Sequence, residues 1–217
     1  MSTSHNKHAA KSHEPPVLSR RDTLKVAGVT GLTVALLGLG HMTPALAEEL
    51  TRLAHGSPMT GARLADILRT ERTSWNGLLA QVRPDRMEIP GAVGEWSVKE
   101  LVAHLTWYER AVLDGAQQVL SGGTFTRRRP DNMDLDDMNS QIAAESRARP
   151  VSDVLAEADD VFGRLLTLIA ACPQDILNDS RLLGLPDDIP PWMRVANNSY
   201  AHYREHEADL RAWLATQ

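Results

Sequence analysis

Apolar residues recur at spacings of three and four in several long segments beyond residue 60, and clusters of Pro and Gly separate these segments. Such spacing places the apolar side chains on one face of an α-helix. Runs that alternate apolar and polar residues, as half-buried strands do, are nearly absent. The pattern therefore predicts an all-α fold.

Four long helices are predicted from this periodicity. They cover 60–82, the segment from Ser97 to the stop at Gly122-Gly123, the segment from Ser152 to just before Pro173, and the segment from Trp192 almost to the C-terminus. The third is predicted to turn five side chains toward the core: Leu155, Phe162, Leu165, Leu168 and Ile169. A shorter helix is predicted over 134–147, inside a polar connector. Because amphipathic helices of this length bury their apolar faces against one another, we predict a four-helix bundle with long connectors over 60–217.

The start of the second helix is the best defined of these boundaries. Ser97 is the predicted N-cap and Glu100 occupies the third helical position, which is the arrangement of a capping box. This phase places His104 on the inner face of the helix, on the stripe that also holds Leu101 and Tyr108.

Three histidines fall on predicted inner faces, and their spacing favours a metal site. His202 and His206 are four residues apart, which separates their Cβ atoms by about 5–6 Å on a helix and lets both imidazoles reach one ion. His104 would add a third ligand from a facing helix and leave positions open for water or a substrate. The alternative is three packed or solvated histidines without a metal. Burying unpartnered imidazoles is unfavourable, however, so we predict a divalent metal ion on His104, His202 and His206.

Two carboxylates, Glu71 and Glu109, lie on the predicted helices in positions that allow a prediction of their roles. Glu71 falls on the inner stripe of the first long helix, where it can serve as a general base near the metal; the alternative is an ion pair with an inner arginine or a position at the rim. Glu109 is offset by five residues from His104, which turns it toward the flank of the helix. We expect Glu109 to be a surface carboxylate; the alternative is a carboxylate that hydrogen-bonds to a ligand histidine and orients it.

The first 47 residues are predicted to be a twin-arginine signal peptide. They contain Arg20-Arg21 in the stretch SRRDTLK, then the glycine-broken apolar segment 26–39, and then a small-x-small cleavage pattern that ends at Ala47. A membrane-spanning helix needs about 20 apolar residues, so a membrane anchor is not expected. Residues 48–59 are predicted to be a flexible segment. The mature protein is therefore expected in the periplasm or outside the cell, with the twin-arginine machinery as its export partner.

Charge and cysteine content exclude several other classes. Five of the 23 basic and two of the 28 acidic residues lie in 1–47, so the rest of the chain carries a formal net charge of −8. An acidic protein has no general attraction to nucleic acid or anionic lipid, and we expect no nucleic-acid partner. Cys172 is the single cysteine, which excludes an intramolecular disulfide.

Two blocks of the sequence resemble a known family. The first is GEWSVKELVAHL at 94–105, followed by WYE at 107–109; the second is NSYAHYREH at 198–206, followed by DLRAWL at 209–214. Both are similar to blocks of the DinB/YfiT-like superfamily, with details that lean toward its ClbS/DfsB-type branch. The resemblance extends over about 60–217.

The resemblance carries expectations about fold and metal. It implies a four-helix bundle with a variant up-and-down connectivity. Many members bind a divalent ion, nickel or zinc above all, through one histidine of the second helix and a histidine pair of the last. In this sequence those residues are His104, His202 and His206.

Known activities of the family suggest a function. They include thiol-dependent transfer and isomerisation, and hydrolytic protection against a genotoxic metabolite. Because low-molecular-weight thiols are mainly cytosolic, an export signal favours hydrolysis. We therefore predict an exported metalloprotein that hydrolyses or detoxifies a small electrophilic molecule. The alternatives are a thiol-dependent transferase, a protein that binds and sequesters a small molecule without turnover, and a structural bundle that forms a homodimer.

Overall fold

The structure, a computed structural model, describes residues 44–126, 128–183 and 189–217. The described part is helical and contains no strand beyond one isolated bridge between Val93 and Trp96. The all-α prediction is confirmed. The helices are α1 (Pro44–Ala54), α2 (Gly61–Leu79), α3 (Val98–Leu120), α4 (Leu135–Arg147), α5 (Val151–Ala170), α6 (Gln174–Asn178), α7 (Pro191–Asn197) and α8 (Tyr200–Leu214), with short 3₁₀ turns at Pro84–Arg86 and Ser180–Leu183.

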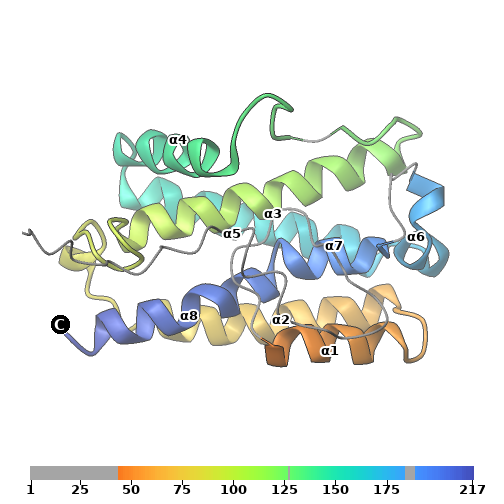
Figure 1. Cartoon of the computed structure of the whole chain (residues 1–217), viewed down its shortest axis with the longest axis horizontal. Coiled ribbons are helices and arrows are strands. Elements are labelled where there is room, and N and C mark those ends of the chain that lie inside the picture. Colours follow the sequence, from red (N-terminus) through yellow and green to blue (C-terminus); the bar gives the residue numbers. More distant parts are fainter. Residues whose placement is uncertain (1–43, 127, 184–188) are drawn as a thin grey trace, which may run out of the picture. The chain divides into compact units, whose positions relative to one another are not determined.

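The long helices pack around a common apolar core (Figure 1). α5 packs against both α2 and α3, α8 packs against α2, and α4 lies along α3. The start of α2 lies directly on the end of α5, because a Cβ at Gly61 would stand only 2.5 Å from the carbonyl oxygen of Ile169. Fully buried side chains of this core include Leu64, Leu68, Leu101, Leu113, Leu165, Ile169 and Leu210.

The predicted capping box at the start of α3 is confirmed. The backbone N–H of Glu100 donates to Ser97 Oγ at 3.3 Å, and the backbone N–H of Ser97 donates to Glu100 Oε2 at 2.7 Å. These two bonds satisfy N–H groups that a helix start leaves without partners. The predicted phase of α3, and with it the inward direction of His104, follows from this start.

The prediction of one continuous helix from Trp192 to the C-terminus is wrong. The chain leaves helical geometry at Ser199 (φ −134°, ψ −105°), which separates α7 from α8. The side chains at this break bond backward: Asn198 Nδ2 donates to the carbonyl of Arg194 at 2.7 Å, and Ser199 Oγ donates to that of Val195 at 2.5 Å. Polar side chains that bond the preceding turn compete with the helix ladder and bend helices. As a result, α8 begins two residues before His202.

The core stripe of α5 also differs from the prediction. The buried positions are Val154, Ala158, Val161, Leu165 and Ile169. The expected Leu155, Phe162 and Leu168 are only partly buried, on the flank of this stripe. The difference arises because α5 packs against α2 and α3 at once, so its apolar surface is wide and periodicity alone does not fix its centre.

The segment 48–59, expected to be flexible, includes most of α1. This helix begins at Pro44, before the predicted cleavage point at Ala47, and buries Leu46 and Leu50 against the core. Met59, in the loop that follows, is also buried. Residues 1–43, which hold most of the predicted export signal, lie outside the described residues. Among the helices that the structure does describe, none is both long enough and apolar enough to cross a bilayer.

Candidate metal centre

α3 and α8 bring the three predicted histidines together. His104 projects from the second turn of α3, and His202 and His206 project from successive turns of α8. The Nε2 atoms of His104 and His202 lie 3.0 Å apart. The ring centroid of His206 lies 5.3 Å from that of His104 and 5.1 Å from that of His202. One nitrogen from each of the three rings falls within 4.8 Å of the others.

The environment keeps these imidazoles neutral. Burial, together with a smaller effect of the neighbouring His206, lowers the pKa of His104 to about 3. Burial also lowers the pKa of His202 well below its ordinary value, with His104 and His206 acting in the same direction. The pKa of the half-buried His206 is lowered by burial and raised by Asp209, with a net decrease. Because metals bind the deprotonated imidazole, the rings are in the binding form at neutral pH.

The unused polar atoms of these rings fit a metal ion. When His104 and His202 face each other through Nε2, only one of the two atoms can carry the shared proton. The Nδ1 atoms of both rings are buried and have no hydrogen-bond partner among the described residues. A cation between the rings would instead bind the Nε2 lone pairs of both histidines, and each Nδ1 would then carry the ring proton. A separation of 3.0 Å suits two nitrogens that each bind one ion at about 2.0–2.1 Å.

Aromatic side chains form the wall around the histidines. The ring of Trp96 lies 4.9 Å from that of His104. The ring of Tyr108 lies 4.9 Å from that of His104 and 4.8 Å from that of His202. Its hydroxyl donates to Asn139 Oδ1 of α4 at 3.0 Å, and burial raises the pKa of Tyr108 to about 12. Tyr108 is therefore a neutral side chain in a fixed position beside the site.

Glu205 belongs to the same surroundings and was missed in the sequence. It is half-buried between the two histidines of α8, and its Oε1 is buried without a hydrogen-bond partner among the described residues. Burial raises the pKa of Glu205 to about 7, and its charge acts on Tyr108. The available signal was its position three residues after His202, which turns a side chain to nearly the same face of a helix.

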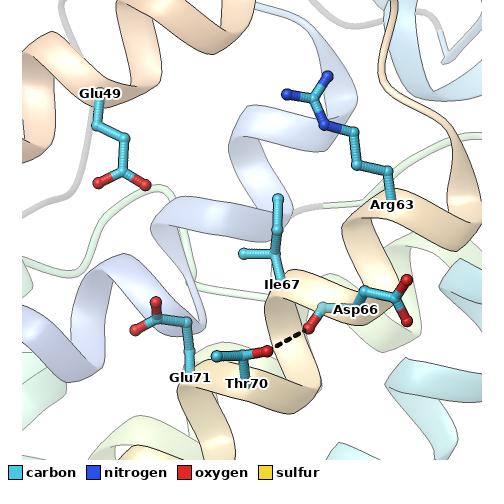
Figure 2. A pocket seen from close by; sticks show the side chains of 6 residues that line it. All are labelled: Glu49, Arg63, Asp66, Ile67, Thr70 and Glu71. Carbon is cyan, nitrogen blue, oxygen red and sulfur yellow. Dashed lines mark hydrogen bonds between the residues drawn. The ribbon is translucent and has the colours of Figure 1, made fainter.

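Glu71 forms an ion pair with Arg204. It lies at a surface groove of about 530 Å³ that residues of α1 and α2 line, where its carboxylate and that of Glu49 turn toward one another (Figure 2). Glu71 Oε2 accepts from Arg204 Nε at 3.0 Å, Oε1 pairs with the same guanidinium, and Arg204 also pairs with Glu49 at 2.7 Å. This is the ion-pair arrangement. The role of Glu71 as a general base stays a prediction.

The expectation that Glu109 lies on the surface is wrong, because this side chain is completely buried. The Tyr203 hydroxyl donates to Glu109 Oε1, and Arg72 Nη1 donates to the Tyr203 oxygen at 3.0 Å. Burial raises the pKa of Glu109 to about 7, against the lowering effects of Arg72 and Tyr203. The partners come from α2 and α8, so the pattern of α3 alone could not reveal that a buried carboxylate has partners there.

Fold and site define a class of protein, namely a helical bundle that brings two buried histidines and one half-buried histidine together. The family model of the DinB superfamily matches residues 67–209, a range that includes all three histidines, and the chain belongs to this superfamily. No curated protein matches the chain.

Solved structures share the fold. An uncharacterised protein from Escherichia coli UTI89 is 18% identical, covers 73% of this chain and 95% of its own length, and has a TM-score of 0.62. ClbS, a colibactin self-resistance protein solved in complex with double-stranded DNA, is 16% identical over 72% of this chain and 96% of its own, with a TM-score of 0.61. DfsB, a sibling lethal factor precursor, is 14% identical over 73% and 97%, with a TM-score of 0.64. At such low identities the likeness shows the fold alone.

Proposed function

We propose that this protein is an exported, metal-dependent enzyme that hydrolyses, and thereby detoxifies, a small electrophilic molecule. The observation that carries the proposal is the convergence of His104, His202 and His206, with one nitrogen of each within 4.8 Å of the others. Zinc and nickel are the ions proposed, because an all-imidazole ligand set suits both. A resistance role for ClbS, a protein of the same fold, supports detoxification as the direction of the chemistry.

The chain's own residues would shape the site for such a reaction. A divalent ion on the three histidines would supply Lewis-acid catalysis and make water a better nucleophile at neutral pH. Trp96 and Tyr108 cover the buried rings and limit the access of bulk water. Glu205 presents a carboxyl oxygen that has no hydrogen-bond partner among the described residues, near Tyr108, where it can hold a hydrogen-bond donor of the substrate.

Export completes the proposal and favours hydrolysis over thiol-dependent transfer. The twin-arginine route carries folded proteins, which suits a metal site loaded before export.

The predicted homodimer stays a prediction. The large apolar side chains exposed in the described part are Ile89, Leu120 and Leu182, which belong to three different segments of the chain.

Metal analysis and turnover together test this function. Untagged protein from an exporting host should contain about one zinc or nickel ion per chain, as one three-ligand site requires. Assayed against a panel of esters, epoxides and alkyl halides, the loaded protein should form many equivalents of hydrolysis product, and chelation should abolish this activity. Protein without stoichiometric metal would overturn the proposal. Consumption of only one equivalent, with no product released, would identify a sequestering protein instead.

A further inference from the structure

The two helices that carry the histidines have little direct packing between them. α3 packs mainly against α5 and α4, whereas α8 packs mainly against α2 and α7 and contacts α3 at only a few positions. α8 also begins at the break beside Ser199, close to His202. A metal site nevertheless requires its ligands to be held to within about 0.2 Å of their bonding distances. Broad apolar packing holds α8 against α3 only indirectly, through α2 and α5.

A buried polar network joins these helices next to the histidines. Tyr203, which follows His202 directly, donates its hydroxyl hydrogen to Glu109 of α3. Arg72 of α2 donates to the Tyr203 oxygen at 3.0 Å and lies 3.6 Å from Glu109 Oε2. The second guanidinium nitrogen of Arg72 donates to Asp159 of α5 at 3.1 Å, so the network links α2, α3, α5 and α8.

The ring of Tyr203 is held as firmly as its hydroxyl. The indole of Trp75 stacks on it at 5.5 Å with an interplanar angle of 16°, and the guanidinium of Arg72 lies 5.8 Å from its centroid. Glu109, Tyr203 and Arg72 expose 0%, 3% and 7% of their surface. The Tyr203–Glu109 bond therefore has a fixed position inside the core.

Stability alone does not account for such a network. Buried charged groups lose their hydration, and well-packed apolar residues of similar volume often stabilise a protein as well or better. A bond between Tyr203 and Glu109 adds something that apolar packing lacks, namely one defined register of α8 on α3. Glu109 lies five residues after His104, about 7.5 Å along the helix axis, so this register sets where the His104 ring meets His202.

We propose that Glu109, Tyr203 and Arg72 are positioning residues for the metal centre. They touch neither the ion nor the substrate and act by holding α8 against α3 so that the three imidazoles converge. The inference rests on the metal site of the proposed function. It adds a specific consequence: the affinity for metal depends on the Tyr203 hydroxyl, although that hydroxyl is not a ligand.

Two tyrosines of α8 provide a matched test. Tyr203→Phe keeps the stacked ring and removes only the hydroxyl. Tyr200→Phe is the control, because Tyr200 is also fully buried in α8 but its hydroxyl has no hydrogen-bond partner among the described residues. The zinc dissociation constant, measured in the full-length protein by competition with a chelator, should rise about 10-fold for Tyr203→Phe, the lower end of the effect of residues that orient ligands. Tyr200→Phe should bind zinc like the wild type.

Cobalt(II) substitution gives a readout that a general loss of stability would not change. The visible spectrum of bound cobalt should change in Tyr203→Phe at saturating metal and stay unchanged in Tyr200→Phe. If Tyr203→Phe does not fold, Glu109→Leu and Glu109→Gln replace it. The Gln side chain still accepts a hydrogen bond from the Tyr203 hydroxyl, so Glu109→Gln should keep the zinc affinity of the wild type. Glu109→Leu cannot accept this bond and should bind zinc about 10-fold more weakly.

The outcomes separate the two proposals. Suppose that the wild type binds zinc but Tyr203→Phe has the same zinc affinity and cobalt spectrum, or that the two Glu109 variants bind zinc equally well. Either result would overturn the positioning role and leave the metal site intact. Failure of the wild type itself to bind zinc or nickel would overturn the proposed function, and the positioning role with it.

Discussion

The Nε2 atoms of His104 and His202 lie 3.0 Å apart, although 98 positions separate the two residues in the chain. Both side chains are almost completely buried, at 3% and 5% exposure. Two neutral imidazoles in contact can share a single hydrogen bond, and both Nδ1 atoms lack a partner among the described residues. An ion that binds both Nε2 lone pairs explains the close approach of the two rings better than apolar packing does, and the pair then supplies two of the three ligands of a site that His206 completes.

Each histidine of the site should therefore matter for metal binding. We expect His104→Ala, His202→Ala and His206→Ala to lower the affinity for zinc by more than about 100-fold, because loss of a ligand should exceed the 10- to 100-fold effect of residues that only orient ligands. His55→Ala is the control, since His55 is exposed in the loop after α1. Isothermal titration or chelator competition measures the affinity. Equal zinc affinity of all four variants would argue against the site.

The folding stability of the metal-free protein should decrease at acidic pH because of His104. The ordinary pKa of a histidine is 6.5, and burial lowers that of His104 to about 3. As the pH falls below 6.5, the unfolded state takes up the proton first. The stability that neutral His104 contributes above pH 6.5 is therefore lost progressively toward pH 3.

A variant isolates this contribution. Glu109 and Glu205, whose pKa values burial raises to about 7, act in the opposite direction as the pH falls, so the wild-type curve alone is not decisive. Both carboxylates remain in His104→Gln. Thermal unfolding from pH 8 to pH 4, with chelator present, should show a steeper decline of Tm in the wild type than in His104→Gln. Parallel curves would contradict the assigned cause.

Glu71 can be tested as a base against a matched carboxylate. Glu71 and Glu49 both pair with Arg204. If the ion pair is its whole role, Glu71→Gln should resemble Glu49→Gln, with zinc content and turnover unchanged and stability lowered by at most about 1 kcal/mol, as expected of a partly exposed pair. Chemical denaturation and steady-state kinetics measure the two effects. If Glu71→Gln alone loses turnover, by about 100-fold or more, the result would support Glu71 as the general base.

The sequence was most informative where one helix carries the whole signal. Ser97 and Glu100 form a cap from residues three apart, so the start of α3 and the inward face of His104 could be predicted. The spacing of His202 and His206 likewise predicted two rings on one face of α8. These local patterns were enough to predict which three histidines the structure brings together.

Features that depend on several helices could not be predicted in this way. Glu109 is buried because Arg72 and Tyr203 reach it from α2 and α8, and no pattern within α3 indicates those partners. The break between α7 and α8 depends on backward hydrogen bonds of Asn198 and Ser199, residues that are also tolerated inside helices.

Export is the remaining prediction, and α1 makes its consequences specific. Replacing Arg20-Arg21 with two lysines should retain the protein in the cytoplasm, because the paired arginines are the signature of the twin-arginine route. The exported wild type should begin at Glu48, after cleavage at Ala47. This cut would remove the buried Leu46 and leave Leu50 in the core and Glu49 paired with Arg204.

Cell fractionation and intact mass decide the export prediction. The processed protein should keep its metal and unfold cooperatively, because the residues of α1 that follow Ala47 keep their contacts with the bundle. A variant of the signal that replaces only Lys25 by Gln is the control and should still be exported. An unprocessed wild-type chain, found in the cytoplasm with its metal bound, would contradict export while leaving the three-histidine centre in place.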